Sequence, residues 1–365
     1  MPRRFAGAKP DETVLCRTQY TRERRAGFAM RIAIGETSPP MTAPLSLEEI
    51  RAAARRLSGG IVTTPVHRLS GPEAAALLGA NTEVLLKLEL FQRTGTFKAR
   101  GALLNVLGLT EAQRQRGVTA ISAGNHAVAV AFAAAAVGVS AKVVMIATAN
   151  PLRVALCKSY GAEIVSARDA HVGFDLVNRI AQDEGRALIH PFEGRTTALG
   201  TATLGLELME QAAGLEAVLV PIGGGGLCAG VASAIKLCAP DCQVFGVEPE
   251  GADTMHRSFA AGEPRSIDRV ATIADSLGAP YALPFSFELC RRNVDGLALV
   301  SDDELRSAMR FLLRNAKLAV EPAGAAATAA LLGPLRDRLR GRRVGVIVCG
   351  SNIDEASYAR LIADD

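Results

Sequence analysis

The chain has 365 residues, of which 49% are hydrophobic and 21% charged, so it is long enough to bury a large core and form two domains. No apolar run reaches the roughly 20 residues of a membrane helix, because Gly138, Ser140 and Lys142 interrupt the longest one. The whole chain has a net charge of +4, and residues 1–40 alone account for it, so residues 41–365 together have no net charge. We therefore expect a globular protein that binds neither membrane nor nucleic acid.

Residues 1–40 form a basic leader that is rich in arginine, lacks the apolar core of a signal peptide and ends in TSPP before Met41. We expect a disordered tail or a start codon assigned upstream of Met41, and a targeting or partner-binding arm is the alternative. The 7 cysteines are scattered and show no CxxC or Cys/His spacing of a zinc site. Their pattern predicts a reducing, cytoplasmic setting without structural disulfides.

From Ser46 onward, short β-branched runs alternate with longer helical stretches, which is typical of a parallel sheet covered by helices. The predicted strands are 83–89, 118–122, 142–147, 163–167, 187–190, 217–223, 243–249 and 344–350. Helices are predicted near 46–57, 98–108, 125–138, 151–160, 173–184, 198–213, 226–238, 302–317, 322–332 and 354–362. Ligands bind at the carboxyl ends of such strands, so the polar loops SAGNH, PIGGGGL and CGSNID should converge on one cleft.

Lys98 stands in the first turn of the helix predicted at 98–108, where backbone N–H groups already carry partial positive charge. The helix dipole and Arg93 or Arg100 should lower the pKa of its amine, and a neutral amine forms an imine with a carbonyl. A solvated lysine without a function is the alternative, and it is favoured if this helix is considered alone.

The SAGNH loop places Ser122, Asn125 and His126 at a strand-to-helix turn. A capping turn explains Ser122 and Asn125 without any function, and His126 would then be a buried or capping histidine. Considered alone, this loop favours the structural explanation slightly.

Four glycines, Gly223, Gly224, Gly225 and Gly226, lie between an apolar strand and a helix. Four in a row exceed what helix packing needs, and they predict a backbone cradle for an anion. Glu248 lies roughly where a dinucleotide fold places its ribose-binding acid, so a nicotinamide enzyme is a rival, although the GxGxxG spacing is not met.

Cys349 ends the last apolar strand. Such a cysteine is usually a small hydrophobic residue, and the sequence identifies no base that would make it a nucleophile. An imine-forming lysine together with a phosphate cradle is what pyridoxal phosphate requires, and this combination favours a function for Lys98.

Eight motifs, in this order along residues 46–356, resemble the serine/threonine dehydratase and serine racemase family of pyridoxal-phosphate enzymes. They are KLELFQRTGTFKARGA, SAGNHA, HPFEGRTTALGTATLGLEL, PIGGGGL, GVEPEGA, IADSLGAP, EPAGAA and CGSNID. The resemblance implies the tryptophan-synthase-β-like fold of type II, an α/β fold with two open, mostly parallel twisted sheets covered by helices. The cofactor would lie in the cleft between a large domain (41–115 and 195–365) and a small one (116–194).

The resemblance also implies roles for single residues. Lys98 would be catalytic, linking to pyridoxal 5'-phosphate as an imine and later moving the Cα proton. Phe97 would pack on the pyridine ring, Asn125 would hydrogen-bond the phenolic oxygen and Cys349 would face the pyridine nitrogen. The implied phosphate contacts are Gly223, Gly224, Gly225, Gly226 and Leu227, and the implied substrate contacts are Ser122, Gly124 and His126.

A thiol at Cys349 cannot force protonation of the ring nitrogen, which favours prompt loss of a β-hydroxyl over transamination. We predict a catabolic ammonia-lyase that converts L-threonine and/or L-serine to a 2-oxo acid and ammonia. Ala123 cannot carry the second proton that racemisation needs, so we favour a dehydratase and keep a serine racemase as an alternative. A dehydratase of another β-hydroxy amino acid, such as 3-hydroxyaspartate, is a further alternative. A nicotinamide oxidoreductase is another possible function, but it gives Lys98 no role. A non-catalytic binding protein is supported only by Val128 and Ser276, which depart from the family pattern.

Glu248 and the Ala252 carbonyl stand where cation-binding relatives have ligands, but Thr254 replaces an acid. One strong carboxylate is fewer ligands than a divalent cation usually has, so a metal at this position stays an open alternative. Similar enzymes are commonly dimers, and we expect a homo-oligomer that acts on a small amino acid.

Overall fold

The computed structural model describes residues 43–122, 124–147 and 149–363, and residues 41–365 form one compact unit. The predictions for the basic leader and for Ala123 fall on residues outside the described ranges. The predicted boundaries of the large and small domains stay predictions. Among the described residues, no helix is long and apolar enough to cross a membrane.

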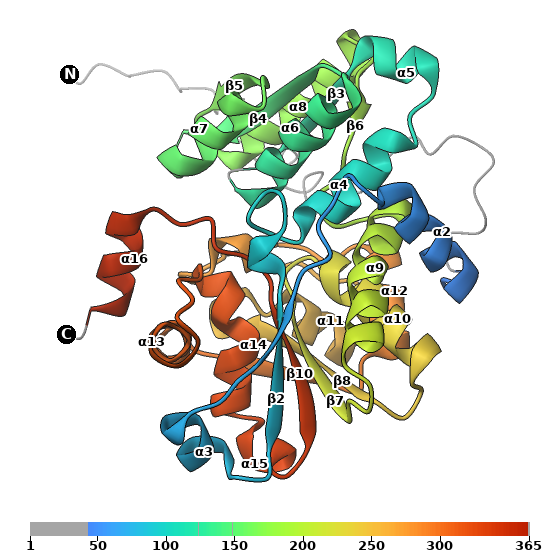
Figure 1. The fold of residues 1–365 in the computed structure, drawn as a ribbon. Coiled ribbons are helices and arrows are strands. Elements are labelled where there is room, and N and C mark those ends of the chain that lie inside the picture. The colour runs from blue at the N-terminus through green and yellow to red at the C-terminus, as the bar shows by residue number, and fades with distance from the viewer. Residues whose placement is uncertain (1–42, 123, 148, 364–365) are drawn as a thin grey trace, which may run out of the picture. The chain divides into compact units, whose positions relative to one another are not determined.

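The larger sheet has six strands in the order β1-β2-β10-β7-β8-β9, and they come from both halves of the chain (Figure 1). Their bounds are Val66–Arg68 (β1), Glu83–Leu88 (β2), Arg343–Val348 (β10), Ala217–Pro221 (β7), Gln243–Pro249 (β8) and Gly296–Val300 (β9). All neighbours run parallel except β1, which pairs antiparallel with β2 at one edge. Strand β7 is buried along its whole length, as expected of a parallel strand with helices over both faces.

Helices cover the six-stranded sheet. Helix α14 (Pro322–Leu332) packs across strands β7 to β10, and α13 (Asp302–Ala316) packs against α14. Helices α9 (Arg195–Gln211) and α10 (Gly226–Cys238) lie together on the opposite side in Figure 1. Helix α14 is made of small and apolar residues all round and is buried, whereas α13 presents only one apolar face and begins with a capping box of Ser301 and Glu304.

The smaller sheet has four parallel strands in the order β5-β4-β3-β6. Their bounds are Glu163–Ala167 (β5), Ala141–Ile146 (β4), Val118–Ile121 (β3) and Ala187–Leu188 (β6), and helices α6 (Asn125–Val137), α7 (Pro151–Ser159) and α8 (Ala170–Asp183) connect them. Successive residues of β4 face opposite sides: Val143 packs with Val130 of α6, and Val144 packs with Val177 of α8.

The remaining helices are α2 (Leu47–Leu57), α3 (Pro72–Leu78), α4 (Lys98–Leu107), α5 (Glu111–Arg116), α11 (Thr254–Ala261), α12 (Pro284–Asn293), α15 (Arg336–Leu339) and α16 (Glu355–Ile362). Every strand and helix that the sequence predicts is present, and two helix-covered, mostly parallel sheets confirm the α/β class. The sequence analysis misses β1, β9, α3, α5, α11, α12 and α15. Most of these are short, and α5 buries none of its residues, so they carry little periodic signal.

Candidate active site

Four helices begin around one cavity. They are α4, α6, α10 and α14, and none of them has a hydrogen bond from the side chain of its N-cap residue. The same holds for α3, α9, α11, α12 and α15, whereas α2, α5, α7, α8, α13 and α16 each begin with such a cap. Uncapped N-termini keep backbone N–H groups available, so this part of the molecule is suited to an anionic ligand.

This cavity lies where strands β7 and β10 end, because Pro221 and Cys349 line it. Its walls include every residue that the sequence assigns to the cofactor, namely Phe97, Lys98, Asn125, Gly223, Gly224, Gly225, Gly226, Leu227 and Cys349. They also include Phe192, Ser276 and Glu321, which the sequence analysis does not assign to the site. The structure thus brings together residues that are up to 252 positions apart in the sequence.

Lys98 reaches the cavity because the chain before α4 is tied to the end of β10. The Phe97 N–H donates to the Cys349 carbonyl at 3.2 Å, and the Ser351 N–H donates to the Gly95 carbonyl at 3.0 Å. These two bonds place the start of α4 beside Cys349. The Lys98 ammonium donates to the Pro191 carbonyl at 2.7 Å and lies 5.0 Å from the centroid of the Phe97 ring.

Burial lowers the pKa of Lys98 to about 8, against smaller opposing effects of Cys349 and Glu321. The predicted direction is therefore right, but the predicted contribution of Arg93 or Arg100 is wrong, because burial lowers this pKa and neither arginine is among the causes. Desolvation of the ammonium favours the neutral amine that imine chemistry needs.

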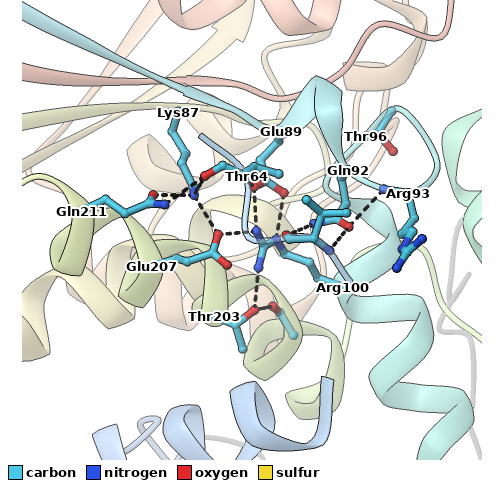
Figure 2. A network of polar contacts seen from close by, with 12 residues as sticks. Thr64, Lys87, Glu89, Gln92, Arg93, Thr96, Arg100, Thr203, Glu207 and Gln211 are labelled. Atoms are coloured by element: carbon cyan, nitrogen blue, oxygen red, sulfur yellow. Dashed lines mark hydrogen bonds and ion pairs between the residues drawn. The ribbon is translucent and has the colours of Figure 1, made fainter. Parts of the chain in front are cut away.

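Arg100 belongs instead to a buried ionic network (Figure 2). Its guanidinium donates to both carboxylate oxygens of Glu89 at 2.8 Å and to Glu207 at 2.6 Å. The Lys87 ammonium, also buried, donates to Glu207 at 2.7 Å and to two neutral oxygens. Two cations face two carboxylates, so the network is charge-balanced, and it joins α4 to β2 and α9.

Asn125 projects into the cavity from the first turn of α6. Its amide nitrogen donates to Glu321 at 2.7 Å and to the Ser276 hydroxyl at 3.1 Å, and its oxygen accepts from Asn352 at 2.9 Å. Both amide hydrogens are thus engaged. The capping explanation of this loop is wrong for Asn125, because Gly124 is the N-cap of α6 and no side chain caps that helix.

Glu321 is the acid of the cavity wall and is 1% exposed. Arg153 from α7 pairs with it at 3.1 Å and also pairs with Asp275 at 2.5 Å. Burial raises the pKa of Glu321 to about 7, although Arg153 and Asn125 act in the opposite direction. A carboxyl group that titrates near neutrality therefore lines the cavity. The EPAGAA motif contained this residue, but its burial depends on contacts distant in sequence.

The glycine turn is packed more tightly than the sequence analysis assumes. A Cβ at any of its four glycines would lie 3.0 Å or less from a neighbouring atom, and Phe192 is that neighbour for Gly224 and Gly226. Gly225 also has a φ of +92°, which favours glycine. The inference that four glycines exceed what packing needs is therefore wrong. Because these glycines carry no side chains, backbone atoms form this part of the cavity wall. The N–H groups of the first turn of α10 therefore remain accessible.

Cys349 is buried at the end of β10, and its thiol donates to the Ala323 carbonyl at 3.3 Å. Burial raises the pKa of this thiol far above its usual range, and the nearby Glu321 adds to that effect. The group that lines the cavity is therefore a neutral thiol, a weak donor with no charge of its own.

Of the three residues expected to contact substrate, only His126 lines one of the two cavities. His126 is buried, its Nε2–H donates to the Ile189 carbonyl at 2.8 Å, and it lines a second, smaller cavity that adjoins Lys98. The Ser122 hydroxyl accepts from the Gly124 N–H at 3.0 Å. Neither Ser122 nor Gly124 belongs to the described walls of the two cavities, so their role in substrate binding stays a prediction.

Glu248 has a structural role in this fold. Its two carboxylate oxygens accept from the Met255 and His256 N–H groups at 2.7 Å each, at the start of α11. It therefore serves as a cap for that helix. Within the described ranges there is no cluster of three or more His, Cys, Asp or Glu that could hold a metal ion. The contacts of Glu248 also weaken the nicotinamide rival.

The cavity fits pyridoxal phosphate. It offers an amine with a lowered pKa at Lys98, an uncapped helix N-terminus at α10 for a phosphate, and the Phe97 ring beside Lys98 as an apolar wall for a flat ring. Cys349 and Asn125 supply polar groups at other points of the wall.

Comparisons with known proteins agree with this fit. Residues 57–350 match the family model described as "Pyridoxal-phosphate dependent enzyme". The chain is 57% identical over 314 residues to a phenylserine dehydratase of Ralstonia pickettii, covering 86% of this chain and 95% of the relative. It is 39% identical over 320 residues to the catabolic L-threonine dehydratase of Escherichia coli K12, covering 87% and 96%. The structure of maize serine racemase superposes with a TM-score of 0.82 at 33% identity, covering 87% of this chain and 97% of that one.

Proposed function

The chain belongs to the family of pyridoxal-phosphate dependent enzymes and uses that cofactor, and from this premise we propose that it is an ammonia-lyase for β-hydroxy amino acids. The reaction would remove the β-hydroxyl as water and yield a 2-oxo acid and ammonia. The observation that carries the proposal is the Lys98 amine, which has a pKa lowered to about 8 and lies in a cavity walled by uncapped helix N-termini.

Bound pyridoxal phosphate supplies an electron sink for the bonds at the substrate Cα. The N–H groups at the start of α10 would hold its phosphate, and Phe97 would pack against its ring. Lys98 would link to the cofactor and then accept the Cα proton at Nζ, which requires the neutral amine that burial favours. These roles rest on the geometry of the wall and on the family pattern.

Cys349 and Asn125 would tune the reaction. The neutral thiol of Cys349 would leave the pyridine nitrogen without a charged partner, and a weaker electron sink favours rapid loss of the β-hydroxyl. Asn125 would donate to the phenolic oxygen after giving up one of its two present acceptors, Glu321 or Ser276. The Ser276 bond is the longer of the two and is therefore the one we expect to break.

We propose phenylserine as the preferred substrate, because the 57% identity extends over 95% of a phenylserine dehydratase. Threonine and serine, which the sequence analysis predicts, are the second candidate, supported by the 39% identity to a threonine dehydratase. Racemisation stays the alternative, and Ala123 argues against it from the sequence alone.

A substrate panel tests this proposal. The holoenzyme would be assayed with phenylserine, L-threonine, L-serine and 3-hydroxyaspartate by release of 2-oxo acid, with formation of D-serine from L-serine followed in parallel. We expect the highest kcat/KM for phenylserine, and release by Lys98→Ala that is at least about 10²–10⁴-fold slower. Formation of D-serine as fast as pyruvate would favour a racemase, and no 2-oxo acid from any substrate would refute the lyase.

A further inference from the structure

Three consecutive residues after β6 face the Lys98 region. The Ile189 carbonyl accepts from His126, and the Pro191 carbonyl accepts from the Lys98 ammonium at 2.7 Å. His190 lies between them and lines the second cavity with Lys98 and His126. The backbone on both sides of His190 thus contacts two residues with expected roles in the site, whereas His190 itself has none assigned.

Backbone hydrogen bonds fix the tautomer of His190. Its Nδ1 accepts from the Phe192 N–H at 3.3 Å and from the Glu193 N–H at 2.9 Å, so Nδ1 carries no proton. In a neutral imidazole the proton must then be on Nε2. The ring also packs edge-on against Phe192, with centroids 4.7 Å apart and an interplanar angle of 87°, which restricts its rotation.

The Nε2–H of His190 is a buried donor without a partner among the described residues. Such groups are rare in folded proteins, and each asks for an explanation. Two threonine hydroxyls line the same cavity and have other partners: Thr201 donates to the Gly226 carbonyl at 2.7 Å, and Thr197 accepts from the Asn105 amide at 3.1 Å. The orientation of His190 is therefore fixed by its Nδ1 contacts, and its Nε2–H is available to a ligand.

The ring is a hydrogen-bond donor and not an acid. Burial lowers its pKa to about 3, and the nearby Lys98 charge acts in the same direction, so the ring stays neutral across the physiological range. An oxygen acceptor beside it would also lie near Lys98 and the first turn of α10, because Lys98 and Gly226 line both cavities. A neutral donor beside a helix N-terminus suits an anionic oxygen.

We propose that His190 is a ligand-binding residue whose Nε2–H donates to an anionic oxygen held between Lys98 and the start of α10. The oxygen belongs either to the cofactor phosphate or to the substrate carboxylate. This inference rests on the proposed function for the identity of the ligand. It assigns His190 to binding only, since a neutral imidazole N–H gives up no proton in the reaction.

A pair of substitutions separates the two nitrogens of His190. His190→Asn retains an oxygen close to the Nδ1 position, where it can accept from Phe192 and Glu193, but removes the Nε2 donor. His190→Gln places an amide donor near the Nε2 position and gives up the Nδ1 acceptor. Thermal unfolding of both variants reports the role in the turn, and ligand binding reports the role of the donor.

Two titrations distinguish the sources of the oxygen. In the first, apo-protein is titrated with pyridoxal phosphate and followed by absorbance; in the second, KM for phenylserine or threonine is measured at saturating cofactor. Loss of a hydrogen bond to a charged oxygen should weaken binding by about 10- to 100-fold in His190→Asn, with recovery in His190→Gln. An effect in the first titration identifies the phosphate, and an effect in KM alone identifies the carboxylate.

The proposal is overturned if His190→Asn changes neither cofactor affinity nor KM by more than twofold, or if His190→Gln is as impaired as His190→Asn. Should either variant fail to fold, nitrogen NMR of the ¹⁵N-histidine-labelled wild type decides. We expect an Nε2–H tautomer whose proton resonance shifts when cofactor or substrate is added, and an unshifted resonance or an Nδ1–H tautomer contradicts us. The cofactor titration needs no turnover, so it tests His190 even if the lyase assignment fails.

Discussion

Two buried polar clusters flank the start of α4, and they are built in opposite ways. The network of Lys87, Glu89, Arg100 and Glu207 balances two cations against two carboxylates at distances of 2.6–2.8 Å (Figure 2). In the cluster around Lys98, the ammonium donates to a carbonyl and not to a carboxylate, the Glu321 carboxyl has a raised pKa, and the Nε2–H of His190 has no partner among the described residues.

The difference separates a structural cluster from a functional one. Charges that are fully paired inside a protein lock elements together, and little is left to bind a ligand. Groups held in unfavourable environments, beside uncapped helix ends and a cavity, are typical of a site. Position in the sequence does not reveal this, because Lys98 and Arg100 are two residues apart and belong to different clusters.

Removal of the Lys98 amine should have the largest effect on activity and little effect on stability. Lys98→Ala takes away the proposed proton acceptor, and we expect 2-oxo acid release to fall by at least about 10²–10⁴-fold. The variant loses one hydrogen bond, to Pro191, so the free energy of unfolding should change by less than about 1.5 kcal/mol. Steady-state kinetics and urea unfolding measure the two quantities, and a large loss of stability would contradict the comparison.

Removal of the Arg100 charge should do the reverse. Arg100→Met leaves Glu89 and Glu207 buried with one cation between them, which should lower the free energy of unfolding by about 3–5 kcal/mol. Urea unfolding measures it. The matched control is Arg306→Met, which breaks a pair with Asp303 at the surface and should change stability by less than about 1 kcal/mol. Equal effects of the two substitutions would show that the buried network is not structural.

The Glu321 carboxyl should give stability a pH dependence that Glu321→Gln removes. Its pKa is raised in the folded state from 4.5 to about 7, so the folded protein binds more protons than the unfolded one between these values. Stability due to this group is therefore present below pH 4.5 and is lost as the pH rises toward 7. Wild type should lose stability relative to Glu321→Gln across that window, and unfolding at several pH values measures the difference. A pH-independent difference would mean that the pKa of Glu321 is not raised.

The smallest expected effect is that of Ser276→Gly. The Ser276 hydroxyl takes one of the two amide hydrogens of Asn125, and its removal frees that hydrogen for the cofactor. One neutral hydrogen bond corresponds to about a two- to tenfold change, so the apo-protein should bind pyridoxal phosphate tighter by that factor. Absorbance titration measures it. Weaker binding would show that Ser276 supports the site instead of competing with the cofactor.

The sequence predicts the elements of this fold well where the periodicity is strong. The bounds of β8, α10 and α14 are reproduced to the residue, because each is a long apolar run with a glycine or proline signal beside it. Strand β1 is a three-residue edge strand, and α5 has no buried residue, so neither has a pattern to detect. Tertiary contacts alone define them.

The candidate site is predicted less evenly. Loops at strand ends converge on one cavity, as expected of an open α/β sheet, and Lys98, Asn125 and Cys349 are found there. The causes of their properties were not predictable, because the pKa of Lys98 depends on burial by residues far away in sequence. Glu321 was missed because its partners Asn125 and Arg153 lie 196 and 168 positions away in the sequence. His190 was missed because only the coordinates show that its Nε2 has no partner among the described residues.

The identity of the lysine that links to the cofactor tests the central claim most directly. Holoenzyme would be reduced with borohydride, digested and analysed by peptide mass spectrometry to locate the phosphopyridoxyl group. We predict a single labelled lysine, Lys98, and no label in Lys98→Ala. Label on another lysine such as Lys87, or equal label in the variant, would contradict the assignment of the two clusters.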